Sequence, residues 1–97
     1  MKIIAMYILE CANKTYYVGS TRDLQRRLEE HKSGMGANYT RKHLPVKLIF
    51  YEEFNRVDNA YYRECQVKNW SSKKKIALIN SDKNSLKLLS KGRERNE

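Results

Sequence analysis

The first apolar run of the chain, residues 3–9, contains no charged residue and is rich in Ile, Met, Tyr and Leu. An uninterrupted apolar run of this length predicts a strand covered on both faces, and therefore the central strand of a sheet. Asn13 and Lys14 indicate a turn, after which residues 15–18 combine Thr, Tyr and Val, which favour strands. The two runs predict a β-hairpin, and Gly19 is expected to turn the chain into a helix or to admit a close approach.

The length of the hairpin loop decides where two tyrosines lie, because side chains alternate between the faces of a sheet. A two-residue loop would place Tyr7 and Tyr17 on opposite faces. A three-residue loop over residues 12–14 would pair Leu9 with Tyr17, and Tyr7 would then lie diagonally across on the same face. The hydrophobic pattern alone is compatible with both loops.

A helix is expected over residues 22–32, because Ser20 and Thr21 are residue types that cap helix N-termini. Arg27 and His31 follow at i, i+4 spacing, so they share one face of this helix. The sequence therefore gathers an arginine and a histidine close to the tyrosines of the hairpin.

The rest of the chain continues this α+β pattern. The predicted elements are a helical turn over 37–42, a strand over 46–51 closed by Glu52 and Glu53, a helix over 57–70, a helix over 73–79, and a last helix capped by residues 80–82 that ends near residue 89. Ala60, Val67 and Trp70 form one stripe of the helix over 57–70, which is its predicted core face. We expect one domain over residues 1–90 and a charged tail over 91–97.

Composition narrows the class of partner. The chain has 97 residues, with 20 Lys and Arg against 11 Asp and Glu, which gives a formal charge of +9. Such a balance favours nucleic acid as a partner, although many small domains are basic for solubility alone. The lone Cys11 and Cys65 are typical of free thiols in a reducing compartment, and the first apolar run is too short to span a bilayer. A cytoplasmic protein without a membrane partner is expected.

Few residues could carry out chemistry. Glu64 lies at i, i+4 from Lys68, so it is either a surface carboxylate paired with that lysine or an oxygen ligand for Mg²⁺. Aromatic and basic residues that could stack on bases and meet phosphates are interleaved elsewhere. The candidates for nucleic-acid binding are Tyr39, Arg41, Lys68, Lys73 and Lys74.

The order and spacing of these residues resemble the GIY-YIG nuclease domain. About ten residues separate the two tyrosine motifs, ten more lead to the arginine, and four more to the histidine. The resemblance extends over roughly residues 1–79 and is closest to small stand-alone members, through the stretches GANYTR, PVKL and RExQxK. The residues that carry it are Tyr7, Tyr17, Val18, Gly19, Arg27, His31 and Glu64. The glycine of the first motif is absent, since that motif reads Ala5-Met6-Tyr7.

The resemblance implies a three-stranded sheet flanked by helices and the hydrolysis of phosphodiesters in DNA with one divalent metal, Mg²⁺ or Mn²⁺. It implies that Glu64 holds the metal, that Arg27 stabilises charge on the phosphate, and that His31 assists proton transfer. Tyr7 or Tyr17 would orient or deprotonate the attacking water. Both tyrosines must then face one site, which favours the three-residue loop.

Two other functions remain open at this point. A non-catalytic nucleic-acid-binding module, or a basic component of an RNA–protein particle, would need the positive charge but not the tyrosine, arginine and glutamate set. If the chain is a nuclease, three sources of site choice remain open: it recognises DNA structure, it relies on a protein partner, or it cuts with little sequence preference. The resemblance implies a role in DNA repair or recombination.

Overall fold

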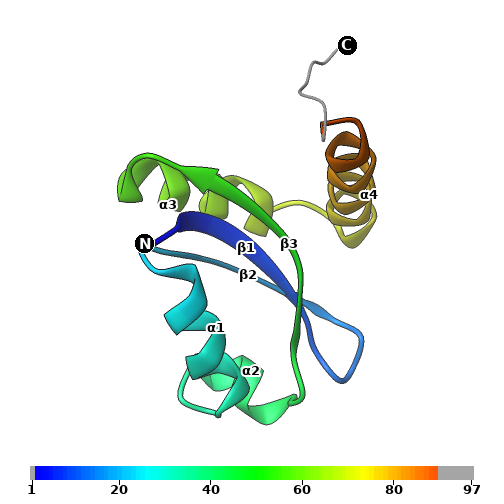
Figure 1. Cartoon of the computed structure of the whole chain (residues 1–97). Coiled ribbons are helices and arrows are strands. Elements are labelled where there is room, and N and C mark those ends of the chain that lie inside the picture. Colours follow the sequence, from blue (N-terminus) through cyan, green and yellow to red (C-terminus); the bar gives the residue numbers. More distant parts are fainter. Residues whose placement is uncertain (1, 90–97) are drawn as a thin grey trace.

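A three-stranded antiparallel sheet forms the centre of the fold in the computed structural model, which describes the backbone of residues 2–89 and the side chains of residues 2–81. The strands are β1 (Ile4–Glu10), β2 (Tyr16–Thr21) and β3 (Lys47–Phe54), in the order β2-β1-β3. The first apolar run is therefore the central strand, as its pattern predicts, and it is covered on both faces (Figure 1).

The hairpin between β1 and β2 has the register of a three-residue loop. Leu9 pairs with Tyr17, and the loop is closed by a hydrogen bond of 2.9 Å from the Cys11 N–H to the Thr15 carbonyl. Lys14 has a φ of +69°, the left-handed conformation that such loops require at their last residue. Tyr7 and Tyr17 consequently lie on the same face of the sheet.

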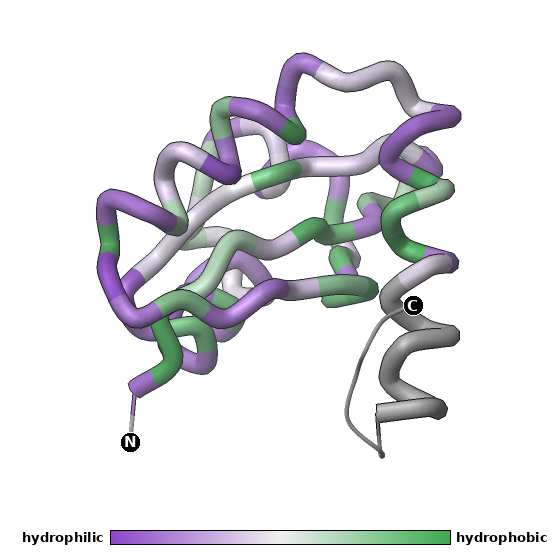
Figure 2. The backbone as a smooth tube through the Cα atoms, turned by 90° about the horizontal axis from the view of Figure 1, so that it is seen from above, coloured by the Kyte–Doolittle hydropathy of each residue, from purple (hydrophilic) through white to green (hydrophobic). Residues whose placement is uncertain are grey.

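Helices cover the sheet in two layers, so each face of β1 contributes to a separate core. Helices α1 (Leu24–Lys32) and α2 (Asn38–Lys42) lie on one face, and α3 (Val57–Lys68) and α4 (Ser72–Leu89) lie toward the other (Figure 1). The buried residues of the first core are Ala5, Tyr7, Leu9, Cys11, Leu24 and Val46. Those of the second are Met6, Ile8, Val18, Phe50 and Val67. Figure 2 shows the hydrophobic stretch in the first half of α4 that also packs on this second core.

The junction between β2 and α1 differs from the prediction. Gly19 does not turn the chain, because pairing of β2 with β1 continues to Thr21, opposite Ala5. Helix α1 begins at Leu24, and its N-cap is Asp23, whose carboxylate accepts a hydrogen bond of 3.2 Å from the Arg26 N–H. Ser20 belongs to the strand, since ladder hydrogen bonds outweigh its preference for a helix N-terminus.

Three further boundaries are also corrected. Strand β3 continues through Glu52 and Glu53 because β1 provides pairing partners as far as Ile4. Helix α3 ends at Lys68, and Trp70 is only partly buried. Residues 80–82 do not divide the C-terminal segment, since α4 runs through them and such polar residues weaken a helix by only a few tenths of a kcal/mol each. The predicted tail over 91–97 lies outside the described residues.

Cys11 and Cys65 are both free thiols, as expected from their isolation in the sequence. Within residues 2–89, no helix has both the length and the apolar character needed to cross a membrane.

The left-handed conformation at Lys14 is unfavourable for any residue with a Cβ atom. We expect Lys14→Gly to raise the free energy of unfolding by about 0.5 kcal/mol, because relief of this strain exceeds the added entropy of an unfolded glycine. Urea denaturation monitored by circular dichroism would measure the change. Lys14→Ala is the control, since it removes the charge but keeps the Cβ atom, and an equal gain in that variant would contradict the explanation.

Candidate active site

A chain of three buried polar side chains lies between the sheet and helices α1 and α2. The Tyr7 hydroxyl is 2.8 Å from Nε2 of His31, and Nδ1 of the same ring is 2.8 Å from Oγ1 of Thr40. His31 and Thr40 are fully buried, and Tyr7 is 2 % exposed. Because buried polar groups must find partners within the protein, these three residues satisfy one another.

His31 is neutral in this environment. Burial lowers its pKa to about 4, and the nearby positive charge of Arg27 acts in the same direction. A neutral imidazole has one N–H donor and one acceptor nitrogen, so His31 can take a proton from one neighbour while it donates to the other.

Gly19 provides the space through which Tyr7 reaches the histidine. The two residues are paired across β1 and β2, and a Cβ atom at Gly19 would lie 2.5 Å from the Tyr7 hydroxyl and 2.6 Å from Cζ. The close approach at Gly19 is thus made by the Tyr7 side chain of the neighbouring strand. Burial also raises the pKa of Tyr7 to about 12, and the Arg27 guanidinium opposes this increase.

Tyr17 flanks the same histidine from the edge strand. Its ring centroid lies 5.3 Å from that of His31, whereas the Tyr7 ring lies 5.7 Å away in an edge-on arrangement. Unlike Tyr7, Tyr17 is only partly buried, so it lies between the buried His31 ring and the solvent.

Glu64 approaches from α3, which packs on the opposite face of the sheet. Its Oε1 atom accepts a hydrogen bond of 2.6 Å from the Ser20 hydroxyl, and its Oε2 atom lies 2.6 Å from Nζ of Lys68. The hydrogen bond to Glu64 raises the pKa of Lys68, and burial, with a smaller contribution from the negative charge of Glu64, raises the pKa of Tyr7. Glu64 therefore meets β2 at Ser20, which directly follows the Gly19 that Tyr7 crosses on the other face of the sheet.

Arg27 lies on α1 beside Tyr7 and retains access to solvent. Its guanidinium forms an ion pair of 2.9 Å with Glu30, and its side chain is 32 % exposed. Glu30 raises the pKa of Arg27, which therefore stays cationic. An ion pair exposed to this extent contributes little stability, so Arg27 can exchange Glu30 for another anion.

The residues at the β2 edge can be tested as a metal site. No cluster of three or more His, Cys, Asp or Glu side chains occurs in the described part of the chain. The Glu64 side chain is 12 % exposed, and one of its oxygens already contacts a cation, the 56 % exposed Lys68. A carboxylate whose cationic partner is exposed and can be exchanged fits Mg²⁺, which is often bound through one or two protein carboxylates and keeps several waters.

The predicted nucleic-acid contacts do not form one cluster. The Tyr39 hydroxyl bonds to the hairpin at Thr15, and Arg41 is exposed and bonds to Asn38. Lys68 is engaged with the Glu64 carboxylate. The remaining two candidates, Lys73 and Lys74, are exposed in the first turn of α4, where Nζ of Lys74 lies 4.4 Å from the Trp70 ring centroid.

Three residues at this site were missed by sequence reasoning: Thr40, Ser20 and Gly36. Thr40 and Ser20 orient His31 and Glu64 through single hydroxyl groups, which leave no periodic signal in the sequence. A Cβ atom at Gly36 would collide with the His31 ring and lie 2.9 Å from its Cα atom. Position in the GANYTR stretch was the only available signal for Thr40 and Gly36.

Comparison with known proteins identifies the family of this chain. The GIY-YIG catalytic domain matches residues 4–77. The chain belongs to the GIY-YIG family. A UPF0213 protein of Streptococcus agalactiae is 44% identical over 79 residues, which are 81% of this chain and 90% of that protein. A UPF0213 protein of Streptococcus pyogenes is 47% identical over 75 residues, which are 76% of this chain and 82% of that protein.

Solved structures support the same fold for this GIY-YIG protein. The solution structure of a UPF0213 protein from Bacillus halodurans is 39% identical, with a TM-score of 0.53 over 79% of this chain and 82% of that one. A protein from Enterococcus faecalis is 29% identical, with a TM-score of 0.50 over 100% of this chain and 96% of that one. The expected family and α+β fold are confirmed, and GIY-YIG is a nuclease family.

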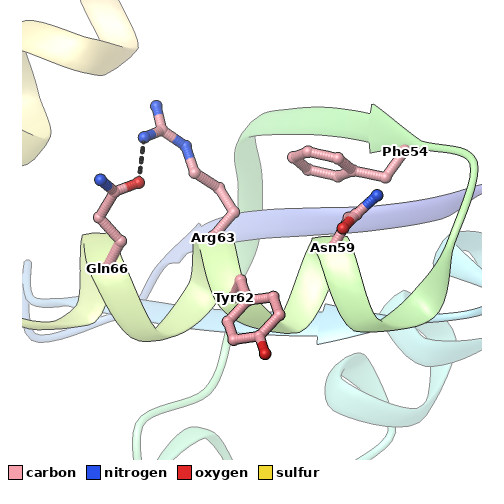
Figure 3. Close-up of a pocket in the computed structure, with 5 residues that line it drawn as sticks. All are labelled: Phe54, Asn59, Tyr62, Arg63 and Gln66. Atoms are coloured by element: carbon pink, nitrogen blue, oxygen red, sulfur yellow. Dashed lines mark hydrogen bonds between the residues drawn. The ribbon is translucent and has the colours of Figure 1, made fainter.

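A separate pocket lies along α3 and the end of β3 and is lined by Phe54, Asn59, Tyr62, Arg63 and Gln66 (Figure 3). Arg63 forms hydrogen bonds there to Gln66 and to both carboxylate oxygens of Glu52. None of these residues contacts the hydrogen-bonded side chains of Tyr7, His31 and Thr40, so this pocket is distinct from the GIY-YIG site.

Burial of neutral His31 makes folding sensitive to acid. The pKa of this histidine is near 6.5 in the unfolded chain and about 4 in the folded protein, so the unfolded state binds more protons between these values. We expect the free energy of unfolding to fall by about 2 kcal/mol between pH 7.5 and pH 5. Urea titrations at several pH values would measure this loss.

The matched controls are the two histidine variants. His43→Gln should keep the acid-dependent loss, whereas His31→Gln should remove most of it. A loss of the same size in His31→Gln would show that another group is responsible.

The contact between Gly19 and Tyr7 predicts a cost for any side chain at position 19. We expect Gly19→Ala to lower the free energy of unfolding by about 1–3 kcal/mol, because the new methyl group overlaps the tyrosine ring. Thermal and urea denaturation would give the value. The cost should shrink when Tyr7 is also replaced by Ala, and an unchanged cost in the double variant would contradict the overlap as its cause.

Proposed function

We propose that this protein is a divalent-metal-dependent endonuclease that hydrolyses phosphodiester bonds in DNA. The observation that carries this proposal is the neutral, buried His31 bonded to the Tyr7 hydroxyl, next to a carboxylate at the sheet edge. A protein that only bound nucleic acid would have no use for a proton acceptor and a carboxylate at one position. Membership in a nuclease family supports the same conclusion.

Proton transfer in this proposal runs from the solvent side inward. As the attacking water gives a proton to the Tyr7 oxygen, the Tyr7 O–H proton moves to Nε2 of His31 in the same step, so no free phenolate forms and the histidine ends protonated. Arg27 stabilises the negative charge that develops on the Tyr7 oxygen during this step, because its positive charge already opposes the rise in the pKa of Tyr7 caused by burial. Tyr17, which is more exposed, orients the water.

Arg27 and Glu64 would stabilise the negative charge of the phosphate. Arg27 exchanges its contact with Glu30 for a phosphate oxygen and stabilises the charge that develops there. Glu64 would hold Mg²⁺ or Mn²⁺, and such an ion, when bound, polarises the phosphoryl group and lowers the pKa of its water. Phosphodiester hydrolysis is extremely slow without catalysis, so both contributions are needed.

In this proposal the DNA is held by basic and aromatic residues from separate parts of the surface. Lys73 and Lys74 would contact phosphates, while Tyr39 and Arg41 would stack on bases or pair with the backbone. Specificity would come from DNA shape or from a protein partner, and repair or recombination in the cytoplasm is the setting we propose.

The decisive experiment is cleavage of supercoiled plasmid and branched DNA by the purified protein. With Mg²⁺ we expect nicking that EDTA abolishes, and we expect Glu64→Gln to reduce the rate at least 100-fold, about the effect of removing one charge-stabilising group. Gel electrophoresis would measure the rate, and fluorescence anisotropy would measure DNA binding, which Glu64→Gln should retain.

Glu53→Gln serves as the control, because Glu53 is an exposed carboxylate of β3 that lies outside the site. Nicking that survives in Glu64→Gln would contradict the role of this carboxylate. Tight DNA binding by the wild type without cleavage of either substrate, in Mg²⁺ or Mn²⁺, would favour a non-catalytic nucleic-acid-binding module instead.

A further inference from the structure

Thr40 continues the buried chain beyond His31, and nothing in the proton transfer proposed above uses it. The residue is fully buried in the short helix α2. Its Oγ1 atom lies 2.8 Å from Nδ1 of His31 and 3.0 Å from the carbonyl oxygen of Ala37. Thr40 thus stands between a ring nitrogen of His31 and a backbone acceptor.

Counting protons gives the direction of each hydrogen bond. A carbonyl oxygen can only accept, so the single hydroxyl proton of Thr40 points to Ala37, and Oγ1 is left as an acceptor. Nδ1 of His31 must then carry the proton that fills the 2.8 Å contact. Since a neutral ring has one N–H, Nε2 is an acceptor and takes its hydrogen bond from the Tyr7 hydroxyl.

The reverse arrangement makes fewer hydrogen bonds. If Nε2 carried the proton and donated to Tyr7, the Tyr7 hydroxyl proton would have no acceptor among the described side chains. Thr40 would also have to turn its proton from Ala37 toward Nδ1. A buried donor without an acceptor is costly, so this tautomer is disfavoured.

We propose that Thr40 is a positioning residue that fixes the proton of His31 on Nδ1, and so keeps Nε2 free to take the proton of Tyr7. The hydroxyl acts only through the imidazole and does not touch substrate. Its effect on the reaction rests on the proposed nuclease function, whereas the position of the proton on His31 does not.

Other contacts hold Thr40 in place. Tyr39, its neighbour in α2, bonds through its hydroxyl to Thr15 in the hairpin, and the Ala12 N–H donates to the His43 carbonyl at 2.9 Å. Gly36 allows the segment before α2 to pass directly against His31. Helix α2 is therefore anchored on both sides of the residue that contacts the imidazole.

Nitrogen NMR of the histidine ring tests the proposal directly. In ¹⁵N-labelled wild type at neutral pH, with His31→Gln used for assignment, we expect Nδ1 of His31 protonated and Nε2 unprotonated. Thr40→Val replaces the hydroxyl with a methyl group, and we expect the preference for the Nδ1 proton to fall at least tenfold. Thr40→Ser keeps the hydroxyl and should keep the wild-type state, as should Thr21→Val, which makes the same change away from His31.

The nuclease assay provides a second measurement. We expect Thr40→Val to lower kcat by about 10- to 100-fold with little change in KM, and Thr40→Ser to restore most of it, since general acid–base catalysis contributes about 10²- to 10⁴-fold. If Thr40→Val acted only by disrupting the folded structure, it would not lower kcat while leaving KM unchanged, and Thr40→Ser would not selectively restore kcat.

Two results would overturn the proposal: a wild-type His31 protonated on Nε2, or a folded Thr40→Val variant that keeps the full preference for Nδ1. Should Thr40→Val fail to fold, the wild-type spectrum and Thr40→Ser still decide the question. A wild type with the proton on Nδ1 but no cleavage of any DNA would contradict the nuclease function and leave the assignment of Thr40 intact.

Discussion

Tyr7 packs across Gly19 and reaches His31, and the arrangement of the site depends on this contact. Tyr7 lies in the central strand, where burial on both faces would normally exclude a polar group. The absence of a Cβ atom at Gly19 lets the ring lean over β2, and the histidine provides the partner that its hydroxyl needs. The same contact therefore fixes the packing of the Tyr7 ring, the hydrogen bond of its hydroxyl and the position of the proton acceptor His31.

The edge strand β2 also explains how groups from opposite faces of the sheet meet. Gly19 and Ser20 are consecutive, so they point to opposite faces. Gly19 faces the core that contains Tyr7, whereas the Ser20 hydroxyl bonds to Glu64 of α3. Because β2 pairs with β1 alone, its outer edge is where the two helical layers can both contribute side chains.

The charged residues near this edge are paired, but their pairs are easily exchanged. Glu64 contacts Lys68, and Arg27 contacts Glu30, and in each pair one or both side chains have substantial exposure. Exposed ion pairs contribute about 0–1 kcal/mol each. Helix α1 and the strands supply rigid positions, while these contacts leave the charges available to a phosphate or a cation.

Sequence patterns determined the features that depend on local periodicity and residue type. The apolar run predicted the central strand, and the i, i+4 spacing placed Arg27 and His31 on one face of α1. The order and spacing of tyrosine, glycine, arginine, histidine and glutamate were enough to recognise the family, because spacing along the chain can be read without any tertiary contact.

Tertiary structure decided what depends on a partner distant in the chain. The ends of β2 and β3 follow the pairing offered by β1, which no local propensity encodes. The roles of Thr40 and Ser20 arise from single hydroxyl groups whose partners are 9 and 44 residues away. Hydroxyl groups are common in any sequence. Only burial next to an imidazole or a carboxylate shows which hydrogen bond a particular hydroxyl makes.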